Sequence, residues 1–96
     1  MASGYVIGQM QITDPVQYEE YRAHVVATVE AHGGEFLVRG GPQSVKEGTP
    51  AGPRSVILRF PSVEAAQAWY HSSAYQQIIP LRQGASTGVL TIVEGV

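Results

Sequence analysis

Residues 55–71 read SVILRFPSVEAAQAWYH, and this stretch predicts a strand that leads directly into a helix. Every second residue of its first part is apolar, as in a strand with one buried face: Val56, Leu58 and Phe60. Ser62 then supplies the hydroxyl of a helix N-cap, so we expect a helix over residues 63–71. A further helical stretch is expected over residues 74–85, and Pro80 should kink or divide it because proline has no amide hydrogen to donate.

The chain before this unit has the same order of a strand and then a helix. Residues 5–13 alternate between two faces like a strand. Asp14-Pro15 is typical of a helix start, since aspartate caps the first free amides and proline needs none at that position. The helix is expected to run to His32 and to end at Gly33-Gly34.

Residues 35–39 form the next predicted strand, and strict alternation places Leu37 and Arg39 on the face opposite Phe36 and Val38. Two glycines and a proline at residues 40–42 interrupt the strand, as expected at the edge of a sheet. Pairing is expected to resume around residues 44–47, before an exposed loop over residues 48–53. A last strand is expected over residues 89–94.

This order of elements predicts a ferredoxin-like βαββαβ sandwich of the α+β class, with a four-stranded antiparallel sheet and both helices on one face. Residues 1–96 then form a single domain. The other sheet face should mix aliphatic side chains with Gln9, Arg39 and Arg59. That face is too apolar for water and too polar for a dry core, so we predict a homodimer closed as an α+β barrel around a polar-lined cavity. A monomer with one partly polar, wet sheet face is the alternative.

The composition excludes several functions. Six Lys and Arg against eight Asp and Glu leave a net charge of −2, which argues against nucleic-acid binding. The absence of cysteine excludes disulfides, thiolate metal sites and thiol catalysis. No apolar run approaches the roughly 18 residues that cross a bilayer, and no signal peptide is apparent, so we expect a cytoplasmic protein without membrane contact.

Motifs along nearly the whole chain resemble the domain of unknown function (DUF) 1330 family. They are Gly4-Tyr5-Val6-Ile7, Thr13-Asp14-Pro15, residues 33–41, Phe60-Pro61-Ser62 and Val93-Glu94-Gly95. The resemblance implies the dimeric α+β barrel superfamily. Related barrels include cofactor-free monooxygenases of the antibiotic-biosynthesis type, haem-degrading enzymes and lactone isomerases. If the protein is an enzyme, the resemblance implies a monooxygenase-like or isomerase-like activity without a cofactor.

Arg39 is the strongest candidate for a site residue. It ends a strand, and the two glycines after it would let a ligand approach the backbone closely. A guanidinium at this position can hold a carboxylate or an enolate oxygen through two parallel hydrogen bonds. The structural alternative is an ion pair with Glu35, Glu47 or Glu94.

Further candidates have side chains that can orient a ligand: Tyr5, Gln9, Tyr70 and Arg82. His71 is the candidate for proton transfer, because the pKa of histidine lies near neutrality. A surface salt bridge for Arg82 and a surface histidine at a helix end are the ordinary interpretations. His24 and His32 lie eight residues apart on one helix, too far for the helical pair of a metal site, and no metal or cofactor is predicted.

The sequence therefore predicts a small homodimeric protein that binds or converts a small organic ligand with an acidic or carbonyl oxygen in the barrel cavity. The alternative is a non-catalytic dimerisation or ligand-sensing module in which the arginines form interface pairs. A defined pocket that contains Arg39 would favour the first hypothesis. Arg39 locked to a carboxylate would favour the second.

Overall fold

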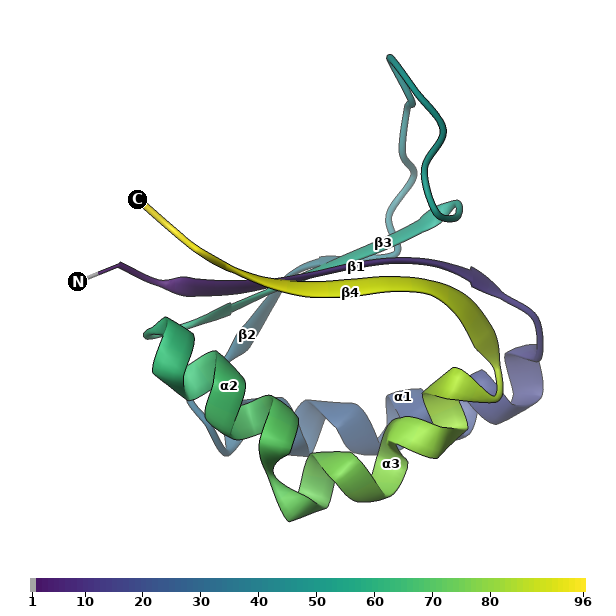
Figure 1. The fold of residues 1–96 in the computed structure, drawn as a ribbon. Helices are drawn as coiled ribbons and strands as arrows, with labels where there is room; N and C mark the ends of the chain where they lie inside the picture. Colours follow the sequence, from purple (N-terminus) through teal and green to yellow (C-terminus); the bar gives the residue numbers. More distant parts are fainter. Residues whose placement is uncertain (1) are drawn as a thin grey trace.

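The computed structural model describes residues 2–96, which form four strands and three helices in two layers; Met1, where the predicted domain begins, lies outside the described residues. The elements are β1 (Gly4–Ile12), α1 (Pro15–Glu30), β2 (Glu35–Arg39), β3 (Arg54–Phe60), α2 (Val63–His71), α3 (Ser73–Gln83) and β4 (Ser86–Glu94). The strands pair antiparallel in the order β2-β3-β1-β4. All helices cover the same face of the sheet (Figure 1), so the predicted ferredoxin-like βαββαβ sandwich is confirmed.

Polar side chains cap the first turns of α1 and α2 at the positions that the sequence predicts. The Asp14 side chain accepts a hydrogen bond from the Gln17 amide at 3.1 Å, and Ser62 accepts one from Ala65 at 3.1 Å. Each bond satisfies one of the amides that have no partner within the first helical turn. These caps set the points at which β1 and β3 give way to helices.

The helices differ from expectation at two points, the end of α1 and the proline in α3. Helix α1 ends at Glu30 rather than at His32, and Gly33 follows with the positive φ of 74° that a helix C-terminus needs. Pro80 lies inside α3 without dividing it. Proline removes only the bond that residue 80 would donate to the Gln76 carbonyl, and the Pro80 carbonyl still accepts from Gly84 at 2.9 Å.

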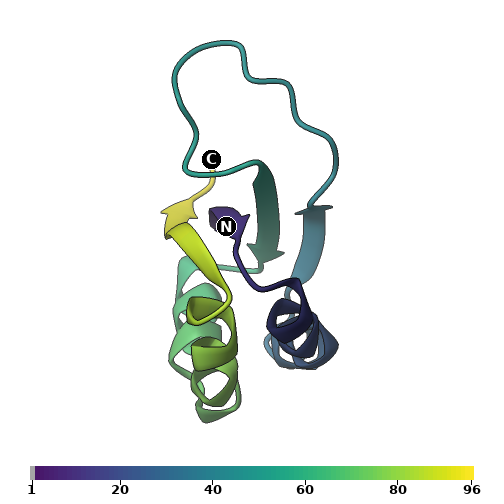
Figure 2. The same cartoon turned by 90° about the vertical axis from the view of Figure 1, so that its right-hand side faces the viewer.

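The core lies between the sheet and the helices, where both layers contribute large side chains. Val6, Leu58 and Phe60 project from the sheet and are at most 3% exposed. Trp69 and Tyr75 meet them from α2 and α3, with ring centroids 4.0 Å apart. Each such side chain contributes about 1.5–3 kcal/mol when it is fully buried. Figure 2 shows α1 and the α2–α3 pair as two columns beneath the sheet.

A bulge in β2 reverses the expected orientation of Arg39. Phe36 pairs with Leu58 and Val38 pairs with Ile57, so the register shifts between them. One extra residue moves every later side chain of the strand to the other face. Arg39 therefore lies opposite Val56 and lines the space between the sheet and the helices. The predicted place of Arg39 on the other face is wrong, because alternation assumed an unbroken strand.

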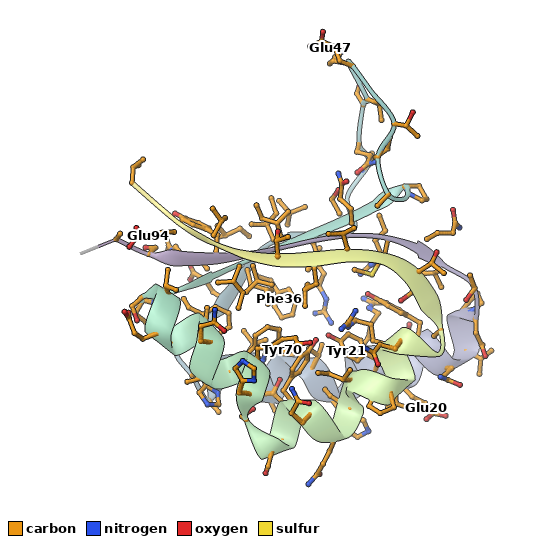
Figure 3. The ribbon with its side chains drawn as sticks, viewed as in Figure 1. Glu20, Tyr21, Phe36, Glu47, Tyr70 and Glu94 are labelled. Atoms are coloured by element: carbon orange, nitrogen blue, oxygen red, sulfur yellow. The ribbon has the colours of Figure 1, made fainter. Side chains whose placement is uncertain are left out.

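Residues 40–53 form an arm that projects from the sheet on the side away from the helices (Figure 1). Glu47 lies near the far end of this arm (Figure 3). The expected pairing at residues 44–47 is wrong, since no strand forms there. Gly40 has a positive φ of 72°, which turns the chain out of the sheet, and Pro42 has no amide to pair.

The sheet face away from the helices, here called the uncovered face, is more apolar than expected. Its central paired positions carry Tyr5, Ile7, Gln9, Val38, Ile57, Val89, Thr91 and Val93, and its outer ones carry Gln11, Glu35, Ser55, Arg59 and Thr87. Among residues 2–96, eight large hydrophobic side chains are exposed, and five of these lie in strands: Ile7, Leu37, Val38, Val89 and Val93. The arginine on this face, Arg59, forms an ion pair with Glu35. With Arg39 absent, the uncovered face is an aliphatic surface with a polar margin.

Candidate functional site

A pocket between the sheet and the helices gathers arginines from both layers, and we call it the arginine pocket. Arg39 and Arg54 reach it from the sheet, while Arg22 and Arg82 reach it from α1 and α3. Its apolar walls include Val6, Phe36, Val56, Leu58, Trp69 and Leu90. Figure 3 shows Phe36 below the sheet and Tyr21 facing it from the helical layer.

The two sheet arginines lie next to each other at the base of the arm. Arg39 pairs across the strands with Val56, two residues from Arg54, so the two side chains are diagonal neighbours on one face. The Arg54 guanidinium lies against Gly40, where a β-carbon would collide with it. Each guanidinium also lies over an aromatic ring: Arg39 is 4.5 Å from the Phe36 centroid and Arg54 is 5.3 Å from the Tyr18 centroid.

The two helical arginines have different partners. Arg22 forms an ion pair with Glu19 at 3.0 Å on the surface of α1. Arg82 lies beside the hydroxyl groups of Tyr75 and Tyr21. Burial alone would lower the pKa of Arg82, but these tyrosines outweigh the effect and raise that pKa overall. Arg82 therefore stays positively charged at the pocket.

Two buried tyrosines share a hydrogen bond in the pocket wall. The hydroxyl oxygens of Tyr21 and Tyr75 are 2.8 Å apart. Burial, together with the neighbouring Tyr75, raises the pKa of Tyr21 far above its usual range. Burial also raises the pKa of Tyr75, and the positive charge of Arg82 offsets part of this rise. Both hydroxyls are neutral at physiological pH.

The charge around the pocket is the opposite of the charge of the whole chain. Four of the six basic side chains line it, although the chain has a net charge of −2. Among the described residues, none of the eight Asp and Glu side chains lines it. The polar groups of the lining are arginine and tyrosine side chains and the Trp69 indole, whose N–H already donates to Thr28 at 3.0 Å. Such a lining suits a ligand that accepts hydrogen bonds and carries negative charge.

The pocket is narrow. Its enclosed volume is about 30 Å³, and about 450 Å³ when the space open to solvent is included. The enclosed part has room for about one or two water molecules. Any organic ligand must therefore lie partly in the open section, where the exposed side chain of Arg39 can move to admit it.

The other predicted site residues lie in two separate places. Tyr5 and Gln9 are on the uncovered face, as predicted, and the Gln9 side chain accepts a hydrogen bond from Ala51 of the arm at 3.4 Å. Tyr70 and His71 lie at the end of α2, where they line a shallow groove with Gln67, Leu90 and Ile92. Of the six predicted residues, the structure brings only Arg39 and Arg82 together in the arginine pocket.

Sequence reasoning missed Arg54, Arg22 and the Tyr21–Tyr75 pair. Arg54 has the same parity as Val56 and Leu58, so extending the predicted strand by one residue would have pointed it toward the helices. Tyr21 is one of the buried residues of α1. Its pairing with Tyr75 joins two helices distant in sequence, and no local pattern indicates it.

The described residues 2–96 contain no group of three His, Asp or Glu side chains placed to hold a metal ion. Over the same range, every helix is too short or too polar to cross a membrane. The side chains that line the arginine pocket are arginines, tyrosines and apolar residues.

Solved structures with the same fold have little sequence in common with this chain. A protein of unknown function from Rhodopseudomonas palustris superimposes with a TM-score of 0.76 and 16% identity, over 99% of this chain and 83% of that one. SnoaB, a cofactor-independent oxygenase from Streptomyces nogalater, superimposes with a TM-score of 0.62 and 10% identity, over 97% and 92%. HapK from Hahella chejuensis superimposes with a TM-score of 0.59 and 16% identity, over 97% and 90%. At these identities the likeness shows the fold alone.

None of the curated proteins matches the chain in sequence. The family model described as a domain of unknown function, DUF1330, matches residues 3–96. This match covers both layers of the sandwich and all four arginines of the pocket. The chain therefore belongs to the DUF1330 family, as its motifs indicated.

Proposed function

We propose that the protein binds a small organic acid in the arginine pocket. The observation that carries this proposal is the charge of the lining, with four arginines and no carboxylate among the described residues. In a partly buried site these cations interact strongly with an anion, because water screens them less than on the open surface. The apolar walls suit the hydrocarbon body of the same ligand.

The environment of Arg39 supports this function over a purely structural role. Within residues 2–96, Arg39 forms no ion pair, and Glu35, which was one possible partner, pairs with Arg59 instead. The Arg39 guanidinium lies over Phe36 and keeps its hydrogen-bond donors available. Arg39 thus meets the condition of a ligand-binding arginine in a defined pocket, now on the helical side of the sheet rather than in a barrel cavity.

The lining supports binding more strongly than proton transfer. No histidine or carboxylate of the described residues lines the arginine pocket, so no ordinary general base faces its ligand. His71, the predicted proton carrier, lies in the groove at the end of α2. A cofactor-free oxygenase-like reaction is the second candidate, favoured by the fold likeness to SnoaB. That reaction would use the arginines to stabilise an oxyanion of the substrate.

We further propose that the protein is a homodimer joined through the uncovered face. Five exposed large aliphatic side chains lie in the strands of this sheet. Figure 3 shows carbon-rich side chains rising from the sheet on the side away from the helices, beside the arm. Apolar surface of this kind on a small domain commonly marks an interface. A second copy would cover it and leave both arginine pockets on the outside of the paired sheets.

A thermal-shift experiment tests acid binding directly. Small carboxylates at about 100 times their Kd are expected to raise the melting temperature by roughly 10–20 °C, because that saturation adds about 2.7 kcal/mol of stability to a domain of this size. Neutral quinones, which offer carbonyl oxygens without charge, are expected to have little effect. The Arg39→Ala variant should lose the shift. The matched Arg59→Ala variant, which removes an arginine from the uncovered face, should keep it.

Two results would contradict the proposal. Equal stabilisation of the parent protein and the Arg39→Ala variant would remove Arg39 from the site. Stabilisation by quinones but not by carboxylates would show that the pocket recognises a carbonyl oxygen rather than an acid. Consumption of oxygen with a bound acid would favour the oxygenase-like reaction.

A further inference from the structure

We infer that the acid bound in the arginine pocket is a dicarboxylate, with its two carboxylates on one short apolar body. This inference rests on the proposed binding function and names the class of ligand. It depends on three features of the pocket: the number of unpaired cations, their division between the two layers, and the buried nitrogens that have no partner.

The number of cations exceeds what one carboxylate can balance. Glu19 balances Arg22. In residues 2–96 the other three pocket arginines, Arg39, Arg54 and Arg82, form no ion pair. Uncompensated charge is costly in a partly buried site, and the three like charges also repel one another. A ligand with two negative charges brings the pocket close to neutrality, whereas a monocarboxylate leaves two cations unbalanced.

The unpaired cations form two groups on opposite walls. Arg39 and Arg54 are neighbours on β2 and β3, at the base of the arm. Arg82 belongs to α3 and lies beside the Tyr75 hydroxyl. A compact anion such as phosphate would be held by one of these groups. Two separate carboxylates can be held by both groups at once.

Buried nitrogens occur in both groups. The Nε atoms of Arg54 and Arg82, like that of Arg22, are buried and have no hydrogen-bond partner among the described residues. A carboxylate that meets a guanidinium side-on accepts from Nε and from one terminal nitrogen together. One such carboxylate at Arg54 and another at Arg82 would satisfy two of the three buried donors. A donor left unpaired in the folded protein carries a desolvation cost that a ligand of this shape removes.

The walls between the two groups are apolar. Val6, Val56, Leu58 and Leu90 project into the pocket from three neighbouring strands. A short hydrocarbon chain or a flat ring in the open section suits this surface, whereas a hydroxylated body would lose its hydrogen bonds to water there. The expected ligand is thus polar at its two ends and apolar between them.

Calorimetric titration of the full chain with two matched pairs of acids tests the inference. Glutarate and pentanoate share a five-carbon chain, and isophthalate and benzoate share a ring, so within each pair only one carboxylate differs. We expect at least one dicarboxylate to bind about tenfold or more tightly than its matched monocarboxylate, as one added charged hydrogen-bonded group provides. Inorganic phosphate is titrated alongside as the compact anion.

Variants locate the second carboxylate. Arg82→Gln should weaken the dicarboxylate about tenfold, to the level of its monocarboxylate, and should leave the monocarboxylate nearly unchanged. Arg59→Gln removes the same charge from the uncovered face and should change neither acid. Circular dichroism of each variant confirms that it is folded before it is titrated.

Each other outcome overturns a defined part of the argument. If the mono- and dicarboxylates of both pairs bind equally, one acidic group is sufficient; the inference fails and acid binding stands. If phosphate binds more tightly than all four acids, the pocket takes one compact anion and the inference also fails. If Arg59→Gln and Arg82→Gln weaken dicarboxylate binding equally, the effect comes from the overall charge of the protein, and the inference fails too. If no acid and no phosphate binds, the proposed function fails with it.

Discussion

The hydroxyls of Tyr21 and Tyr75 illustrate how two ordinary residues acquire a special role in this fold. Each comes from a different helix, and their oxygens meet at 2.8 Å beneath the sheet. One hydroxyl donates to the other, so one hydroxyl hydrogen remains for a further acceptor. Because both side chains line the arginine pocket, that hydrogen adds a neutral donor to the four cations.

This pair makes the stability of the protein sensitive to alkaline pH. Burial raises the pKa of both tyrosines in the folded chain, whereas their pKa in the unfolded chain is about 10. Above that pH the unfolded state has released these protons and the folded state still holds them. Stability contributed by the neutral pair is therefore complete below about pH 10 and falls as the pH rises further.

The double variant Tyr21→Phe/Tyr75→Phe is expected to lose less stability at high pH than the parent protein. Two fewer titrating groups reduce the pH slope by up to about 2.7 kcal/mol per pH unit above pH 10. Near pH 7 the two proteins should be similar, since removal of both partners leaves no unpaired hydroxyl. Urea unfolding between neutral pH and pH 11 measures both quantities. If the free energy of unfolding falls with pH equally in parent and variant, the pair does not titrate as argued. The control is Tyr5→Phe, which removes a tyrosine hydroxyl from the uncovered face.

At the scale of single residues, sequence could predict the caps but not the pocket. The side chains of Asp14 and Ser62 accept hydrogen bonds from amides only three residues further along the chain, so a short stretch of sequence is sufficient to predict their role. Arg54 and Arg82 are 28 positions apart in the chain, and only the packing of α3 beside α1 on one side of the sheet brings them to one pocket. Arg82 could be a candidate from sequence because it lies in the last helical stretch, beside Gln83, from which it could point toward the mouth of a barrel.

At the scale of elements, the short strand β2 decides which face of the sheet carries Arg39. Alternation correctly assigned the faces of β1, which pairs without interruption along both neighbours. In β2 a single extra residue near Leu37 moved Arg39 from one face to the other. The sequence marks a nearby irregularity by the glycines at residues 40–41 but does not show on which side of Arg39 the bulge lies.

Gly40 links the arm to the pocket, and its replacement should affect both. Gly40 has a positive φ of 72°, and a β-carbon there would meet the Arg54 guanidinium. Gly40→Ala is therefore expected to cost about 1–2 kcal/mol of stability and to displace Arg54, weakening acid binding. Gly41→Ala is the matched control, because a β-carbon at that position would have no neighbouring atom within 4 Å. Chemical unfolding and ligand titration measure the two effects; equal behaviour of the two variants would contradict this role of Gly40.

At the scale of the whole molecule, the two faces of the sheet differ in what they carry. The helical side holds the core and the arginine pocket, while the uncovered face presents aliphatic side chains next to the arm. The order of elements predicted the layers because strand and helix periods differ clearly along most of the chain. It could not place the pocket, since a ferredoxin-like sandwich offers space on either side of its sheet; the bulge in β2 then brings Arg39 to the side that holds Arg22, Arg54 and Arg82.

A charge placed on the uncovered face should separate the proposed dimer without disturbing the pocket. Val89 is 56% exposed on β4, opposite Gln9, and a glutamate there would have to lose its water in a sheet-to-sheet interface. We expect Val89→Glu to sediment as a monomer at concentrations where the parent is a dimer, and to bind acids in its pocket as the parent does. Val16→Glu, at a valine 78% exposed on α1, is the matched control and should remain dimeric. A parent protein that sediments as a monomer at micromolar concentration, or a Val89→Glu variant that stays dimeric, would show that the aliphatic strands serve another purpose than self-association.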